Sequence, residues 1–144
     1  MIPTPQTSCD FVGKTVLISG AASGQGEAEA RMLVARGARV IIGDIDVERG
    51  SSLAQALGER ARFVALDVAV ESDWHEAVEV ALGWGGLHGL VNNAGLYRPA
   101  CLLETDVETF EHHYRVNQLG TFLGMKTCAA AMPATQGGSI VNIA

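Results

Sequence analysis

Short apolar runs alternate with longer stretches of helical period along this chain, and this alternation restricts the possible fold more than any other feature of the sequence. Strands joined by helices must run parallel with right-handed crossovers, so that helices cover both faces of the sheet. The pattern therefore predicts an α/β fold with a doubly wound parallel sheet of about five strands. The runs expected to form these strands are residues 14–19, 39–44, 62–66, 87–91 and 139–143.

Helical segments separate these runs. Residues 24–36 place Ala28, Met32 and Ala35 on one apolar face, and Gly37 follows as a helix stop. Other helical stretches are expected at 46–57 and 72–82 and in a long region from 105 to about 133.

Capping residues mark where two of these helices begin. Asp46 is expected to cap the second helix, which Gly58 ends. Thr105, with Glu108 three residues later, fits a capping box for the long helical region that ends near Pro133.

Composition indicates a single globular domain. The chain has 144 residues, of which 48% are hydrophobic and 18% charged. These proportions exclude a disordered polymer, and we expect a flexible tail at 1–10 followed by one domain at 11–144. The tail carries Pro3 and Pro5 but lacks the basic and apolar regions of a signal peptide.

Charge and cysteine content narrow the partners and the compartment. A formal net charge of -6 leaves no basic surplus for a phosphate backbone, so nucleic acid is not an expected partner. No apolar stretch reaches the ~20 residues that a membrane-spanning helix needs. Cys9, Cys101 and Cys128 are widely spaced, which indicates reduced thiols in a cytoplasmic protein. His112 and His113 are adjacent, so on a helix they diverge by about 100° and no metal site is expected.

A glycine-rich turn joins the first strand to the first helix. It reads Ser-Gly-Ala-Ala-Ser-Gly-Gln-Gly over residues 19–26. A pyrophosphate suits such a place, because free backbone N–H groups and the helix dipole attract its charge and glycines let it approach. A glycine-rich loop that did not join a strand to a helix would be equally consistent with a tight structural turn.

An acidic residue ends the second strand. Asp44 lies 18 positions after Gly26 (44 minus 26), close to the ~20-residue offset at which a carboxylate binds the adenosine ribose hydroxyls. A 2′-phosphate would meet this carboxylate as a like charge, and neither Ala22 nor Ser23 supplies a cation. The pattern favours NAD over NADP, the alternative being that Asp44 only caps or solvates a strand end.

The glycine turn resembles that of the short-chain dehydrogenase/reductase family, whose motif is Thr-Gly-x-x-x-Gly-x-Gly. Gly20, Gly24 and Gly26 hold the three glycine positions. Ser19 replaces the threonine and keeps a hydroxyl, whereas Gln25 replaces an isoleucine or leucine.

Further segments match the same family in the same order. Asp67-Val68 follows the third strand, where the family's aspartate contacts the adenine, and Asn92-Asn93-Ala94-Gly95 follows the fourth and lines the cofactor. Residues 116–124 match the family's Val-Asn-x-x-Gly-x-x-x-Gly stretch, in which the asparagine, here Asn117, is catalytic. Residues 138–143 resemble the strand that leads into the catalytic serine.

The resemblance covers residues 11–144 and implies a Rossmann-like fold, NAD as the cofactor and hydride transfer to or from a secondary alcohol or ketone. Among family members it is strongest to hydroxysteroid dehydrogenases, and it implies a homo-oligomer for the full-length protein. The cofactor-binding residues that it implies are Gly20, Ser23, Gly24, Gln25, Gly26, Asp44, Ile45, Asp67, Val68, Asn93, Ala94, Gly95 and Val116.

The family's catalytic Tyr-x-x-x-Lys pair has no counterpart in this sequence. Cys101 stands four residues after Tyr97, and Gln118 stands four residues after Tyr114. A phenol with a pKa near ~10 is a poor base at neutral pH unless a neighbouring cation lowers it. We therefore expect a chain truncated before the catalytic serine, tyrosine and lysine, and inactive by itself. The alternative is a non-catalytic dinucleotide-binding or interaction module from a truncated gene.

Overall fold

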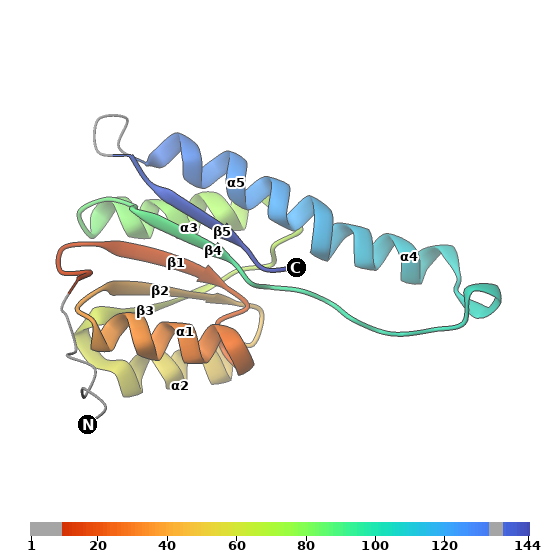
Figure 1. Ribbon diagram of the computed structural model, residues 1–144, viewed down its shortest axis with the longest axis horizontal. Coiled ribbons are helices and arrows are strands. Elements are labelled where there is room, and N and C mark those ends of the chain that lie inside the picture. The colour runs from red at the N-terminus through yellow and green to blue at the C-terminus, as the bar shows by residue number, and fades with distance from the viewer. Residues whose placement is uncertain (1–9, 133–136) are drawn as a thin grey trace, which may run out of the picture.

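A computed structural model describes residues 10–132 and 137–144 of the chain, which form a parallel sheet between two layers of helices (Figure 1). All the strand pairs are parallel, and the strand order is β3-β2-β1-β4-β5. The strands are β1 (Thr15–Ser19), β2 (Arg39–Asp44), β3 (Ala61–Ala65), β4 (Gly89–Asn92) and β5 (Ser139–Asn142).

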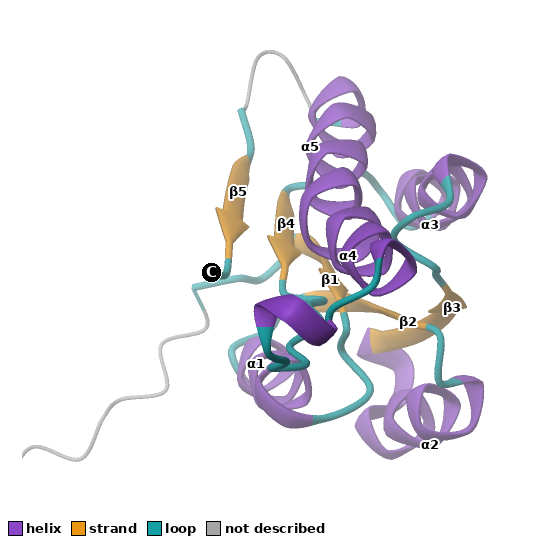
Figure 2. Cartoon of the chain, turned by 90° about the vertical axis from the view of Figure 1, so that its right-hand side faces the viewer, coloured by secondary structure: helices purple, strands orange, loops and turns teal. Residues whose placement is uncertain are grey.

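The helices lie on both faces of this sheet. Figure 2 shows α1 and α2 on one face and α3 and α5 on the other. The α-helices are α1 (Gly24–Ala35), α2 (Val47–Leu57), α3 (Glu71–Gly83), α4 (Val107–His113) and α5 (Gly120–Ala131). Short 3-10 turns form η1 (Gly58–Arg60) and η2 (Leu102–Glu104), and a π-helical segment, η3 (Tyr114–Leu119), joins α4 to α5.

Alternation of side chains along β1 builds a core on each face of the sheet. Val16 and Ile18 pack in the cluster that α1 and α2 cover, which includes Leu33. Leu17 points the other way, into the cluster that contains the fully buried Trp74 of α3. Because β1 lies in the middle of the sheet, all its residues are buried. The parallel strand pairs and the helices on both faces of the sheet confirm the predicted doubly wound fold.

The sequence placed the strands and most helix ends within one or two residues of their observed positions. The second strand, 39–44, agrees at both ends. Asp46 caps α2 as predicted, since its side chain accepts a hydrogen bond from the Arg49 amide, and Gly58 ends that helix. These features are fixed by local chemistry, which explains the agreement.

The apolar face predicted for the first helix was wrong. Met32 is 51% exposed, and Ala28 and Ala35 are exposed as well. The face that packs on the sheet carries Ala30 and Leu33 instead. Both sets of residues have helical spacing, so periodicity alone does not tell which one faces the sheet.

The predicted capping box at Thr105 was also wrong. The helix begins one residue later, because the Asp106 carboxylate accepts a hydrogen bond of 2.8 Å from the Thr109 amide. The Thr105 hydroxyl instead donates to the carbonyl of Cys101, which closes the turn before the helix. Aspartate competes with threonine as an N-cap on nearly equal terms, so either residue fits the sequence pattern.

Some predictions fall outside the described residues, namely nearly all of the N-terminal tail, Cys9, and the helix end at Pro133. Of the cysteines in the described part, Cys101 is exposed and Cys128 is buried, and both are free. Burial raises the pKa of the Cys128 thiol to about 12. In residues 10–132 and 137–144, we find no helix with the length and hydropathy needed to cross a membrane.

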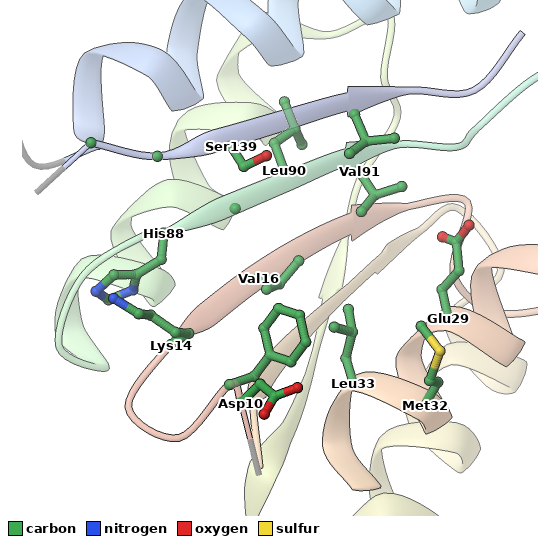
Figure 3. Close-up of a pocket in the computed structure, with 15 residues that line it drawn as sticks. Asp10, Lys14, Val16, Glu29, Met32, Leu33, His88, Leu90, Val91 and Ser139 are labelled. Carbon is green, nitrogen blue, oxygen red and sulfur yellow. The ribbon is translucent and has the colours of Figure 1, made fainter. Parts of the chain in front are cut away.

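One face of the sheet carries an open apolar groove of about 660 Å³ between α1 and strands β1, β4 and β5 (Figure 3). Val16, Leu33 and Val141 contribute to its apolar lining, and Lys14 and His88 lie at one end. None of the residues predicted to bind the cofactor lines this groove.

Candidate functional site

The predicted site residues gather at the carboxyl ends of the strands, where the chain changes direction between β1 and β4. From β1 the chain proceeds outward to β2 and β3, and it returns to β4 on the other side. The helices that follow β1 and β4 lie on opposite faces of the sheet (Figure 2). This edge is therefore the switch point of the sheet, the place where doubly wound folds bind their ligands.

Close packing explains the glycines of the first loop. Gly20 has a positive φ of 66°, and a Cβ added to it would lie 2.8 Å from the Cα of Ala94. At Gly26 an added Cβ would lie 2.4 Å from the carbonyl oxygen of Gly20. Any side chain at either position would push the glycine loop away from the loop after β4.

Hydrogen bonds join the same two loops. The Ser19 hydroxyl accepts from the backbone amides of Asn93 and Ala94, each at 3.2 Å. The Asn93 side-chain amide donates to the carbonyls of Ser19 and Gly20, at 3.2 and 3.0 Å. These bonds fix the backbone of Asn93 and Ala94 against β1. The hydroxyl that replaces the family's threonine thus keeps a structural role.

The N-terminus of α1 is open. Ser23 occupies the N-cap position, but its side chain makes no capping hydrogen bond. Gly24 has a positive φ of 57°, and a Cβ placed there would meet nothing within 4 Å. The Gln25 side chain turns away along the helix and donates to Glu29 at 3.0 Å. The first turn of α1 therefore offers backbone donors and a positive dipole end to an anion.

Asp44 lies beside this opening. One of its carboxylate oxygens accepts from the Ala22 amide at 2.9 Å, and the other accepts from the Asp46 amide at 3.0 Å. A carboxylate has about four acceptor positions on its two oxygens, so these bonds orient it and leave capacity for further donors. Ile45, the next residue, is 74% exposed.

On the far side of the edge, Asp67 follows β3 and is positioned by its neighbours. Its carboxylate accepts from the Ala69 amide at 2.9 Å, and its own amide donates to Asp73 at 3.0 Å. The side chain of Val68 is buried against α5, where a Cβ on Gly120 would lie 2.7 Å from it. Val68 can therefore reach a ligand only through its main chain.

Asn117 lies in the π-helical segment η3. Its side-chain oxygen accepts from the Leu96 amide at 2.7 Å, and its side-chain amide donates to the Leu96 carbonyl at 2.8 Å. Gly95 lies beside it, since a Cβ there would be 3.7 Å from the Asn117 side-chain oxygen. Val116 is half-buried against the core. The side chain of Asn117 thus holds the loop that follows Gly95.

Sequence reasoning did not identify the main-chain partners of the site. The amides of Ala22 and Asp46 orient Asp44, and both backbone groups of Leu96 bind Asn117. Backbone groups are present in every residue, so no residue type in the sequence could have indicated them.

These observations define the class of the protein, a Rossmann-like doubly wound domain whose candidate site residues gather at the switch point of the sheet. A family model described as short chain dehydrogenase matches residues 14–144. The chain belongs to this family of oxidoreductases, as the resemblance in its motifs predicted.

Similar proteins support this assignment. The chain is 40% identical to the 3-alpha-(or 20-beta)-hydroxysteroid dehydrogenase of Mycobacterium tuberculosis, over 92% of this chain and 52% of that protein. It is 43% identical to the sex determination protein tasselseed-2 of Zea mays, over 99% of this chain and 44% of that protein. The chain thus spans about half the length of the curated relatives it matches.

A solved structure has the same architecture. The 3-ketoacyl-(acyl-carrier-protein) reductase from Brucella melitensis, in complex with NADH, matches with a TM-score of 0.88 and 34% identity. The match covers 92% of this chain and 57% of that one.

Proposed function

We propose that this chain is the NAD(H)-binding portion of an oxidoreductase that transfers hydride to or from a secondary alcohol or ketone, with hydroxysteroids as a candidate substrate class. The observation that carries the proposal is the position of Asp44, oriented by two amides beside the open first turn of α1. The NADH in the reductase from Brucella melitensis and the steroid activity named for the mycobacterial relative support it.

The chemistry of the edge fits a dinucleotide. The uncapped start of α1 presents N–H donors where a pyrophosphate would lie, and Gly24 leaves open space there. Asp44 would accept hydrogen bonds from the ribose hydroxyls, and Asp67 would face the adenine. The other proposed contacts are Gly20, Ser23, Gln25, Gly26, Ile45, Val68, Asn93, Ala94, Gly95 and Val116.

Asn117 is the proposed catalytic residue of this portion. A bound nicotinamide would supply or accept the hydride. The residues of this chain would bind the cofactor, and Asn117 would hold the loop at Leu96. The sequence has no Tyr-x-x-x-Lys pair to move the proton, so we expect no turnover by this chain alone. The same observation favours the second candidate function, a non-catalytic dinucleotide-binding module.

The test is a titration of the isotope-labelled chain with NAD and with NADP, followed by the amide signals of residues 20–26. We expect NAD to shift these signals at lower concentration than NADP. Replacing Asp44 with alanine should weaken NAD binding by about tenfold or more, since a hydrogen bond to a charged group contributes about 1.5–3 kcal/mol. NADP binding should change less.

A matched control is Glu59→Ala, which removes an exposed carboxylate at the amino end of β3, away from the edge. It should leave both affinities unchanged. Amide signals at 20–26 that respond to neither dinucleotide would contradict the proposal, as would an unchanged cofactor preference in Asp44→Ala.

We also propose that residues 11–144 form one partial domain, that the protein works in the cytoplasm and that it forms a homo-oligomer. Free cysteines support a reducing compartment. The apolar groove beside the edge strand β5, where Val141 is 46% exposed, supports contact with a second copy of the chain.

A further inference from the structure

A second cavity, of about 850 Å³, lies between the N-terminal half of α1 and the length of α2. Ala22, Asp46 and Arg49 line it. The amides of Ala22 and Asp46 are the two donors that hold the Asp44 carboxylate, at 2.9 and 3.0 Å. The cavity therefore begins directly beside the carboxylate that is proposed to bind the ribose.

The cavity contains arginines, but each has an acidic partner on its own helix. Arg49 lies 3.6 Å from the Asp46 carboxylate, and Arg31 lies 2.8 Å from Glu27. Glu48 lines the cavity as well. The charged lining therefore has three acids against two bases, a balance of -1 (2 minus 3), before Asp44 is counted.

Both carboxylate oxygens of Asp46 interact with donors that could also bind a phosphate. One oxygen accepts from the Arg49 amide at 3.0 Å, which caps α2, and the other faces the Arg49 guanidinium at 3.6 Å. A backbone amide at a helix N-terminus together with an arginine is a common binding arrangement for phosphate. Here a side chain of the protein already occupies that arrangement.

We propose that Asp46 is a second residue that determines cofactor specificity, because its carboxylate occupies the position at the start of α2 that the 2′-phosphate of NADP would need. Asp44 then excludes NADP by its own charge, and Asp46 excludes it by engaging both the backbone amide and the guanidinium of Arg49. This inference rests on the proposed binding of NAD at the same edge.

Replacing Asp46 with serine removes the negative charge of the side chain but keeps a residue that can cap α2. Serine is as good an N-cap as aspartate, so α2 should keep its first turn. The charge balance of the lining rises from -1 to 0 (2 minus 2), and Arg49 loses its carboxylate partner. A 2′-phosphate could then take the place of that carboxylate.

The experiment measures the affinities of NAD and NADP for the 144-residue chain by amide chemical shifts, in the original chain and in Asp46→Ser. We expect NADP binding to tighten by about fivefold, the range of one exposed ion pair, and NAD binding to stay within about twofold. Adding Arg49→Ala to Asp46→Ser should remove the gain.

The matched control is Asp106→Ser, which also replaces an aspartate N-cap by serine but lies on α4, outside the cavity lining. It should leave both affinities unchanged. If Asp46→Ser loses its fold by circular dichroism, the nearly isosteric Asp46→Asn tests the same loss of charge.

Three results would overturn the inference. The first is an unchanged NADP affinity in a folded Asp46 variant that still binds NAD. The second is a gain that persists without Arg49. The third is an original chain that binds neither dinucleotide, which would overturn the proposed function as well, whereas the first two would leave it standing.

Discussion

Asn117 and Leu96 exchange two hydrogen bonds, of 2.7 and 2.8 Å, across 21 residues of sequence. One side chain thus satisfies both backbone groups of a loop residue that has no strand partner. Asn117 lies in a π-helical segment, and such segments recur at functional sites. Asn117 therefore holds this loop at Leu96, just beyond the part of it that Ser19 fixes.

Replacing Asn117 with alanine should release this loop. We expect the Leu96 amide to exchange with solvent at least about tenfold faster, and the chain to lose about 1–2 kcal/mol of unfolding free energy, because two hydrogen bonds disappear. Amide exchange by NMR and urea unfolding measure the two effects. Gln118→Ala, at the exposed neighbouring position, is the control. If the Leu96 amide exchanged at the same rate in both variants, the Asn117 side chain would not be what holds this loop.

Replacing Gly26 with alanine should destabilise the chain by about 2–4 kcal/mol, because the new Cβ would overlap the Gly20 carbonyl at 2.4 Å. The matched control is Gly83→Ala at the end of α3, where a Cβ meets nothing within 4 Å and φ is not positive. That change should stabilise the chain by up to about 1 kcal/mol. Thermal unfolding that moved in the same direction for both variants would contradict the packing argument.

His88 should make the stability depend on pH. The Thr15 amide donates to its Nδ1 at 3.1 Å, so this nitrogen must be unprotonated. Burial, and then the charges of Lys14 and Arg39, lower the pKa of His88.

Between the ordinary histidine pKa of ~6.5 and this lower folded value, the unfolded chain binds more protons, so stability falls as the pH falls through that window. His88→Gln should lose this component, whereas exposed His75→Gln should keep it. Urea unfolding from about pH 7.5 to about pH 5 tests this, and identical pH profiles for the two variants would exclude His88 as the cause.

The apolar groove and the adjacent edge strand should make the chain self-associate. Val141 on β5 is 46% exposed and lines the groove, so Val141→Glu places a charge on this surface. We expect sedimentation velocity to show association of the original chain and mainly monomer for Val141→Glu. Val107→Glu on α4 is the control for a different apolar surface. If the Val107 variant alone became monomeric, the contact would lie on α4 instead.

Much of the fold could be predicted because it depends on local signals. The apolar runs located the strands, Asp46 marked the start of α2, and Gly58 its end. The face of α1 could not be predicted in this way, since both stripes of residues repeat with helical period. The stripe with Gly26 faces the sheet because only glycine allows the close approach to the side chain of Asn93, which follows β4 and is far from α1 in the sequence.

The residues of the candidate site could be predicted from the sequence, but the contacts that orient their side chains could not. Asp44 and Asn117 follow from spacing and from the resemblance, yet what orients them is main chain, in Ala22 and Leu96. The role proposed for Asp46 had no signal in the sequence beyond its capping position, because the cavity exists only once α1 and α2 lie side by side.

The bonds from Ser19 to the loop after β4 have a thermodynamic consequence. They join the part of the chain that builds β1 to β3 to the part that builds β4 and β5. A ligand held by both loops would bind only when the two parts are together, so its binding energy would add to the work needed to separate them. Such a molecule would hold the two halves of the sheet together, and its affinity would report the free energy of their association.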